Sequence, residues 1–70
     1  MTLHELGFDY LGHCACPGKP ERWVHEKRME VKRWKSGQWK LLRGGYMVRY
    51  GRNFESAPIE IKEYMTANNL

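Results

Sequence analysis

The strand pattern of this chain is set by residues 31–51, which read VKRWKSGQWKLLRGGYMVRYG. Runs of aromatic, aliphatic and basic residues are separated here by two turn signals, Ser36-Gly37 and Gly44-Gly45. Such runs favour β-strands, and a glycine-containing pair between two of them is typical of a tight hairpin. The stretch therefore predicts consecutive antiparallel strands joined by two hairpins.

The residues before this stretch extend the predicted sheet. Residues 8–16 are rich in aromatic and small side chains and end at Pro17-Gly18-Lys19-Pro20, a strong turn signal. From residue 22 to 35 the chain is rich in Trp, Val and charged residues and has no Gly or Pro, which predicts one long strand that bends. Together with the two strands that follow, this gives four strands.

Helical signals lie at both ends of the chain. Thr2-Leu3-His4-Glu5 matches a capping box, and Gly7 is placed to end a helix, so residues 3–6 are expected to form a single helical turn. Ser56 and Pro58 favour a helix start, and acidic residues in the first turns suit its positive end. A helix over residues 57–67 would present a narrow apolar stripe made of Ile61, Tyr64 and Met65.

The sequence thus predicts a single α+β domain over residues 1–70. We expect a four-stranded antiparallel β-meander with a short N-terminal helical turn and one C-terminal helix packed on the sheet. A chain of 70 residues buries a marginal core and has no room for a cleft between two domains.

The turn lengths decide which side chains share a face. With two-residue turns, the opposed pairs are Trp34 with Trp39, Trp39 with Tyr50, Leu41 with Val48 and Arg43 with Tyr46, and this face is the natural core. The other face then carries Arg33, Lys40 and Arg49 in one row, beside Val31, Leu42 and Met47. If either turn has three residues, the facing shifts by one, Trp34 or Trp39 becomes exposed, and stacking on bases becomes the favoured use of that ring.

The charge is distributed unevenly along the chain. The net charge is +4, but ten basic and only two acidic residues lie between Arg22 and Arg52, while two basic and six acidic residues lie outside that range. A basic centre suggests an acidic partner, of which nucleic acid is the commonest. The alternative is a solvated sheet whose Lys and Arg residues keep it soluble and deter pairing at its edges.

A metal site and an enzyme active site are both disfavoured. Cys14 and Cys16, with His25, are the candidates for a zinc site, but a CxC pair without a second knuckle is more typical of two buried thiols. We therefore expect no metal and no cofactor. The chain has no phosphate-binding glycine loop, its two Ser residues are at turn and cap positions, and no group is placed to orient a Cys–His pair, so we expect no catalysis.

No run of residues is long and apolar enough for a membrane helix, and the first residues lack the pattern of a signal peptide. We therefore expect a cytoplasmic protein with no membrane partner, either a monomer or a weak homodimer through an exposed sheet edge.

The opening Leu6-Gly7-Phe8-Asp9-Tyr10-Leu11-Gly12-His13-Cys14-Ala15-Cys16 resembles the start of short uncharacterised proteins of bacterial prophages and other mobile elements. Those proteins are similar in having a CxC after a Tyr-Leu-Gly run, then basic hairpins and a short final helix. The resemblance implies a small α+β fold and a mobile-element origin, and it brings no catalytic residue to this chain.

The sequence predicts a non-enzymatic binding module that holds nucleic acid through a basic sheet face. The expected phosphate contacts are Arg33, Lys40 and Arg49, with Lys32, Lys35 and Arg43 adding to the positive field. The alternative is a small accessory factor that covers an acidic protein surface. Joint exposure of Val31, Leu42 and Met47 would favour that protein partner, because protein interfaces centre on apolar anchors.

Overall fold

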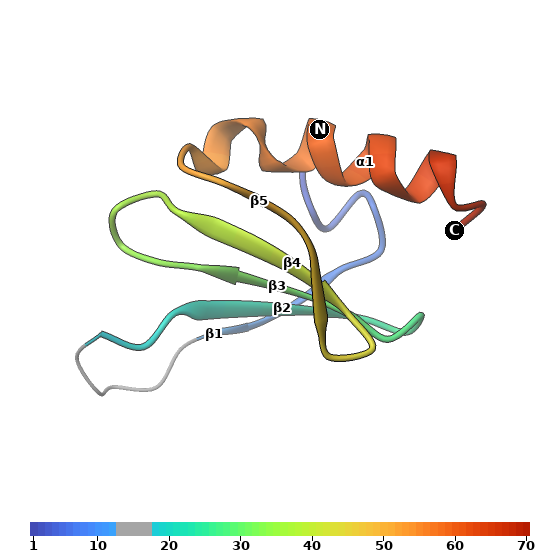
Figure 1. Ribbon diagram of the computed structural model, residues 1–70. Coiled ribbons are helices and arrows are strands. Elements are labelled where there is room, and N and C mark those ends of the chain that lie inside the picture. Colours follow the sequence, from blue (N-terminus) through green and yellow to red (C-terminus); the bar gives the residue numbers. More distant parts are fainter. Residues whose placement is uncertain (13–17) are drawn as a thin grey trace.

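The computed structural model describes residues 1–12 and 18–70 and arranges them in two layers (Figure 1). One layer is a five-stranded antiparallel sheet in which each strand pairs with the next along the chain, and the other holds the C-terminal helix. The strands are β1 (Asp9–Gly12), β2 (Glu21–His25), β3 (Met29–Arg33), β4 (Trp39–Arg43) and β5 (Tyr46–Gly51). A short 3-10 helix, η1 (Phe54–Ser56), leads into α1 (Ala57–Ala67). The predicted α+β class is confirmed.

The hydrophobic core lies between the sheet and the helix. Helix α1 and the segment before β1 cover the same face of the sheet (Figure 1). The largest fully buried side chains are Trp39, Phe8, Met29, Leu41, Ile61 and Val31. The opposite face of the sheet carries no helix, so the described part of the chain has one covered and one open sheet face.

Helix α1 has the predicted bounds and the predicted apolar stripe. Ile61, Tyr64 and Met65 are buried against the sheet, as is Ala57. Ser56 is at the N-cap position, where the sequence predicts that its hydroxyl caps the helix. The hydroxyl instead donates to the Asn53 carbonyl at 2.9 Å.

The prediction of four strands is wrong because the long strand expected over residues 22–35 is a hairpin. Residues 26–28 form a turn between β2 and β3, although they include neither Gly, Pro nor Asn. Arg28 adopts the left-handed conformation that such a turn needs, with φ 65°, and few non-glycine residues do so. Its carbonyl accepts a hydrogen bond from the Gly44 N–H at 3.0 Å, which ties this turn to the turn between β4 and β5.

The N-terminal segment forms a hydrogen-bonded turn over residues 3–7 and not a helix. Half of the expected capping box is present, since the Glu5 N–H donates to Thr2 Oγ1 at 3.3 Å. The Phe8 N–H donates to the Leu3 carbonyl at 3.0 Å, and both side chains are buried. The turn therefore anchors the segment that closes one end of the core.

The turn at Ser36-Gly37 is longer than two residues. Arg33, and not Trp34, pairs with Trp39, and the Trp34 N–H donates to the Gln38 carbonyl at 2.8 Å. The predicted pairing of Trp34 with Trp39 is therefore wrong. Successive residues of a strand point to opposite faces, so Trp39 enters the core while Trp34 lies on the open face.

The turn at Gly44-Gly45 has the predicted two residues, and Arg43 pairs with Tyr46. Beyond it, strand β5 contains a bulge, because Leu42 pairs with Met47 but Leu41 pairs with Arg49. Residue 48 is thus extra, and the rest of β5 is displaced by one position. The predicted pairs Leu41–Val48 and Trp39–Tyr50 are wrong for this reason.

Candidate functional site

Three basic residues form a straight row across the open face of the sheet. Arg22 on β2 pairs with Lys32 on β3, and Lys32 pairs in turn with Lys40 on β4. Tyr50 on β5 continues the same row as the partner of Lys40. Neighbouring strands are about 4.8 Å apart, so the row from Arg22 to Tyr50 spans roughly 14 Å. We call Arg22, Lys32, Lys40 and Tyr50 the cross-strand row.

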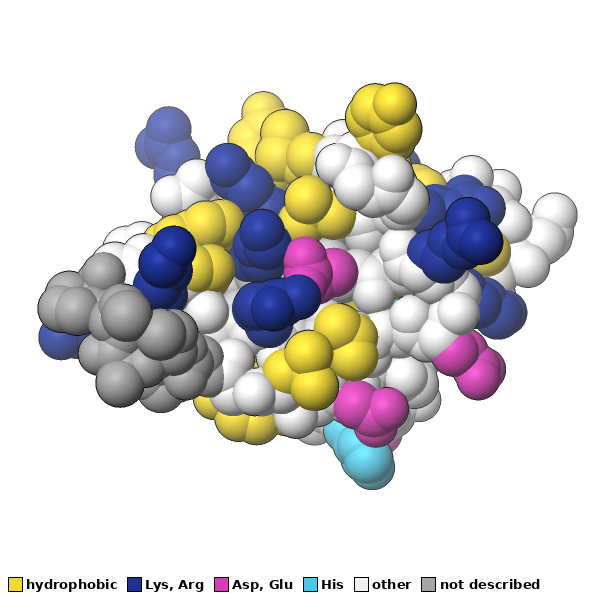
Figure 2. Space-filling model, turned by 90° about the horizontal axis from the view of Figure 1, so that it is seen from below, with side chains coloured by type: hydrophobic (Ala, Val, Ile, Leu, Met, Phe, Trp, Pro, Cys, Tyr) yellow, Lys and Arg dark blue, Asp and Glu magenta, His cyan; other side chains and the backbone are white. Residues whose placement is uncertain are grey.

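The face around this row mixes charge with hydrophobic side chains. Figure 2 shows Lys and Arg side chains gathered beside an acidic one near the middle of the face, with hydrophobic side chains bordering them. The register places Val24, Glu30, Leu42 and Met47 next to the cross-strand row, one on each of four strands. Met47 is half exposed, while Val24 and Leu42 are partly buried.

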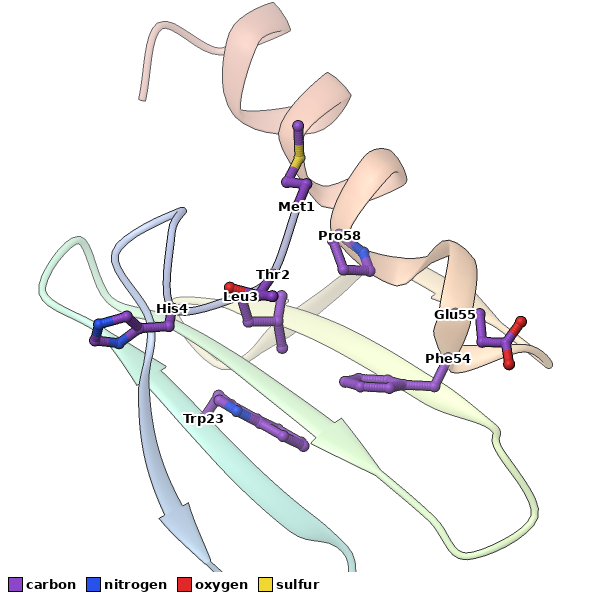
Figure 3. A pocket seen from close by; sticks show the side chains of 8 residues that line it. All are labelled: Met1, Thr2, Leu3, His4, Trp23, Phe54, Glu55 and Pro58. Carbon is purple, nitrogen blue, oxygen red and sulfur yellow. The ribbon is translucent and has the colours of Figure 1, made fainter.

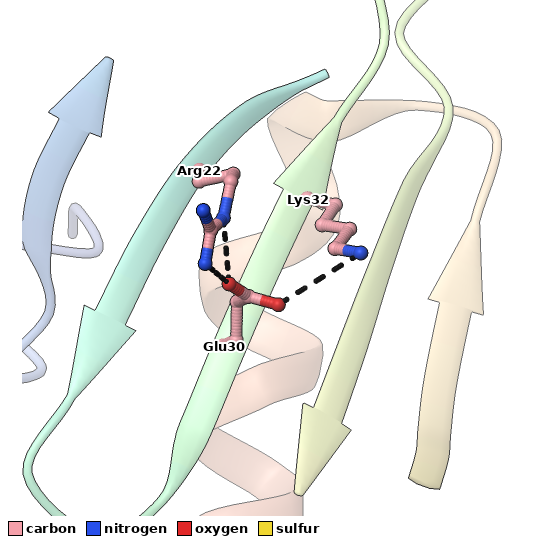
Figure 4. A network of polar contacts seen from close by, with 3 residues as sticks. All are labelled: Arg22, Glu30 and Lys32. Atoms are coloured by element: carbon pink, nitrogen blue, oxygen red, sulfur yellow. Dashed lines mark hydrogen bonds and ion pairs between the residues drawn. The ribbon is translucent and has the colours of Figure 1, made fainter. Parts of the chain in front are cut away.

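Glu30 connects two members of the row (Figure 4). Its Oε2 accepts from Arg22 Nε at 2.7 Å and from the terminal Nη2 of the same guanidinium, and its Oε1 lies 3.9 Å from Lys32 Nζ. All three side chains keep contact with solvent, with the Arg22 side chain 50% exposed. Glu30 therefore partly neutralises the row while holding the Arg22 guanidinium in a fixed orientation.

Aromatic rings lie beside the third cation. Lys40 Nζ lies 5.4 Å from the centroid of the Trp34 ring, within the range of a cation–π contact. Tyr50, directly opposite Lys40, is 65% exposed. Lys40 is thus placed between two aromatic side chains, and the described part of the chain gives it no carboxylate partner.

The predicted row of Arg33, Lys40 and Arg49 does not form. Arg33 pairs with the core residue Trp39, so it points to the helix side, where its Nη1 donates to Glu21 Oε2 at 2.8 Å. The bulge in β5 brings Arg49 to the helix side as well, and its guanidinium carbon lies 5.0 Å from the centroid of the Tyr64 ring.

The remaining predicted residues divide between the two sides of the sheet. Arg43 lies on the helix side, where its Nη1 donates to the Tyr64 hydroxyl at 3.2 Å. Lys35 is exposed in the turn after β3, and Lys32 lies in the cross-strand row. Only Lys32 and Lys40 of the predicted phosphate-binding residues therefore share the open face.

Sequence reasoning missed Arg22, Glu30 and Tyr50 as members of the candidate site. Finding Arg22 required dividing residues 22–35 into two strands, and no Gly or Pro marks that division. The alternative with a longer turn, in which Trp34 or Trp39 would be exposed, is the one the structure adopts, and there Trp34 is partly buried on the open face.

A second candidate site is a cavity on the helix side of the sheet (Figure 3). It has a volume of about 470 Å³ and lies between the N-terminal segment, β2 and the start of α1. Its lining consists of Met1, Thr2, Leu3, His4, Trp23, Phe54, Glu55 and Pro58. The lining is mostly apolar and contains no Lys or Arg, so this cavity does not extend the basic face.

Trp23 and Phe54, which line this cavity, make aromatic and cation–π contacts with each other and with neighbouring side chains. Trp23 stacks on Phe54 with 5.1 Å between ring centroids, and the Arg33 guanidinium lies 4.9 Å from the Phe54 centroid. Tyr10 packs against Trp23 and donates from its hydroxyl to Glu21 Oε1 at 3.3 Å. Partial desolvation, together with the negative charge of Glu21, raises the pKa of the Tyr10 hydroxyl above its ordinary value.

Of the three metal candidates, the structure describes only His25. Cys14 and Cys16 lie outside the described residues, and His25 packs its ring against Phe8, with centroids 4.9 Å apart. His25 Nδ1 also accepts from the Lys27 N–H at 3.1 Å. Within residues 1–12 and 18–70 no three His, Cys, Asp or Glu side chains gather in the manner of a metal site.

Comparisons of the chain with protein-family models, with curated proteins and with solved structures gave no match. Within the described residues, no helix has the length and apolar character needed to cross a membrane.

Proposed function

We propose that this chain is a non-enzymatic module that binds nucleic acid through the open face of its sheet. The observation that carries the proposal is the cross-strand row, which aligns Arg22, Lys32 and Lys40 on adjacent strands of a face that no helix covers within the described residues. Cations in a row can follow a line of phosphates, and the counterions they release supply most of the binding free energy.

The same face also offers apolar contacts for the sugars and bases of a nucleic acid. Leu42 and Met47 lie on the open face next to the row, where sugars and bases would contact them. Glu30 competes with phosphate for Arg22 and Lys32, and the three groups are solvent-accessible, so a phosphate can replace the carboxylate at modest cost.

Binding through this face would be largely independent of sequence. Helix α1 packs on the other side of the sheet and carries Glu60 and Glu63, which phosphates repel, so it is not suited to enter a groove. Contacts from the sheet to phosphates position a nucleic acid without reading its bases.

Fluorescence anisotropy with labelled oligonucleotides tests the proposal. We expect binding that weakens steeply between about 50 mM and about 200 mM salt. Replacing one contacting Lys should lower the slope of log affinity against log salt by about one unit. The change Lys40→Gln should do so, whereas Lys62→Gln, an equal loss of charge on the exposed side of α1, should leave the slope nearly unchanged. Absence of binding at low salt would refute the proposal.

A protein partner is the second candidate, and exposure on the edge strand β5 favours it. Tyr46, Met47 and Tyr50 are 79%, 51% and 65% exposed, and an edge strand can pair with a strand of another chain. The apolar patch expected for such a partner is incomplete, however, because Val31 is fully buried in the core. Sedimentation velocity over a range of concentrations would detect self-association through this edge.

A further inference from the structure

We infer that the nucleic acid held by the open face is single-stranded, with its bases stacked on Trp34 and Tyr50 while Arg22, Lys32 and Lys40 hold its phosphates. The inference rests on the proposed function and specifies the class of its ligand. It follows from the placement of two aromatic side chains on either side of Lys40.

The two rings lie on the same face as the cations. Trp34 follows Arg33, which points to the helix side, and Lys40 Nζ lies over the Trp34 ring, so Trp34 belongs to the open face. Tyr50 is the cross-strand partner of Lys40. It is 65% exposed, and the described residues give its hydroxyl no hydrogen-bond partner and its ring no stacking partner.

A ring on the surface of a sheet can stack only on a base whose own flat face is accessible. In a duplex the faces of the bases are covered by their neighbours, and only the base edges are accessible in the grooves. In a single strand the bases can separate and turn toward aromatic side chains, and this mode of binding tolerates any sequence. The surface that carries the cations also carries one exposed ring, Tyr50, and one partly buried ring, Trp34, and this combination favours single strands over duplexes.

Stacking on Trp34 requires Lys40 to leave the ring, and the exchange is favourable. Trp34 and Lys40 are both partly buried, and a cation–π contact of this kind is worth about a two- to 30-fold change in an equilibrium constant, whereas stacking one base is worth about five- to 150-fold. The released ammonium gains a phosphate of the same strand. Lys40 thus has a contact with Trp34 in the free protein and a contact with phosphate in the complex.

Three probes of equal length separate stacking from contact with the backbone. They are a fluorescein-labelled oligothymidine, an abasic oligodeoxynucleotide with the same phosphates and sugars, and a labelled duplex. We expect the oligothymidine to bind at least about fivefold more tightly than the abasic strand and more tightly than the duplex. The abasic strand should retain the steep salt dependence, because it keeps the phosphates.

Three variants locate the stacking. Tyr50→Leu and Trp34→Leu should each weaken oligothymidine binding by about fivefold or more while changing abasic binding little. Tyr46→Leu is the matched control, because Tyr46 is 79% exposed on the same strand but pairs with Arg43, which points to the helix side. It should leave all three affinities unchanged. Far-UV circular dichroism checks that each variant is folded, and the abasic comparison on the unmodified protein needs no variant at all.

The outcomes separate base stacking on Trp34 and Tyr50 from the proposed binding of nucleic acid itself. Equal affinity for oligothymidine and abasic strand would overturn the stacking inference and leave the proposed function standing, as would tighter binding of the duplex. Failure of all three probes to bind at about 50 mM salt would overturn both and favour a protein partner.

Discussion

Lys32 and Lys40 lie directly opposite one another on strands β3 and β4, on the face of the sheet that helix α1 leaves uncovered. Like charges in this arrangement repel one another and lower the stability of a sheet. Contacts offset the repulsion in part, since Glu30 lies 3.9 Å from Lys32 and the Trp34 ring 5.4 Å from Lys40. A phosphate bound between the two ammonium groups would remove the repulsion, so binding and stability are linked through this pair.

A double-mutant cycle should detect the repulsion between the two lysines. The variants are Lys32→Thr, Lys40→Thr and the double substitution, and the cycle cancels the separate contacts with Glu30 and Trp34. Chemical denaturation in low salt should give an unfavourable coupling of about 0.2–1 kcal/mol, decreasing as salt is added. A favourable coupling energy, or one that does not change with salt, would contradict the repulsion between Lys32 and Lys40.

Removing the negative charge of Glu30 should strengthen nucleic-acid binding. Glu30→Gln releases Arg22 and Lys32 from their ion pairs and leaves three uncompensated cations in the cross-strand row. Anisotropy titrations should show a higher affinity at low salt and a salt slope steeper by about one unit. Glu63→Gln, which gives the same change in net charge on an exposed position of α1, serves as the control. Equal effects of the two variants would mean that only the overall charge matters.

Arg33 and Arg49, which both lie on the helix side, should affect stability more than binding. A variant with Arg33→Gln and Arg49→Gln loses the contacts with Glu21 and Tyr64, and we expect the free energy of unfolding to fall by about 1–2 kcal/mol. Its salt slope for nucleic acid should stay nearly unchanged. The variant Lys32→Gln with Lys40→Gln loses the same charge, yet its slope should fall by about two units. The reverse ranking would restore the row first predicted from the sequence.

The elements with strong local signals could be predicted from the sequence. Pro58 and the spacing of Ile61, Tyr64 and Met65 located helix α1, because helix starts and apolar periodicity depend on neighbouring residues. The pair Gly44-Gly45 predicted its turn correctly, since both glycines adopt the positive φ that a two-residue hairpin turn requires.

The composition of the open face could not be predicted because it depends on register. A turn at residues 26–28 without glycine, a longer turn after Trp34 and the bulge at residue 48 each shift the pairing. A shift of one residue moves a side chain to the other face of a sheet. Arg33 and Arg49 therefore lie on the helix side and not on the open face where the sequence placed them. Lys40 lies on the open face, as predicted.

Stability should fall at alkaline pH through ionisation of Tyr10, whose hydroxyl is partly desolvated and lies beside Glu21. The pKa of Tyr10 is raised in the folded protein, so the folded state favours the protonated hydroxyl that donates to Glu21. The stability contributed by the protonated Tyr10 hydroxyl is complete below the pKa of an unfolded tyrosine. It is lost as pH rises through the higher pKa of the folded state. Denaturation curves at several pH values above 9 should show a smaller alkaline loss in Tyr10→Phe than in the unmodified protein. An identical loss in both would show that ionisation of Tyr10 contributes nothing to the alkaline loss.

Gly51 should be the least replaceable glycine of the sheet. It pairs with Trp39, and a Cβ at this position would lie 2.5 Å from Trp39 Nε1 and 2.8 Å from Cε2. The indole is fully buried between the sheet and the helix, so it cannot move aside without disturbing its neighbours. Overpacking of this kind costs about 1–3 kcal/mol, and Gly51→Ala should lower the free energy of unfolding by that amount in denaturant titrations.

A matched substitution elsewhere separates overpacking from the loss of glycine itself. Gly44 has φ 61° and nothing within 4 Å of an added Cβ. Asn tolerates this conformation, so Gly44→Asn should change the free energy of unfolding by less than about 1 kcal/mol. If Gly51→Ala were equally mild, Trp39 would have to be free to shift, and the close packing of the indole on β5 would be disproved. A large loss in Gly51→Ala alone would locate the cost at the contact between the new methyl group and the indole.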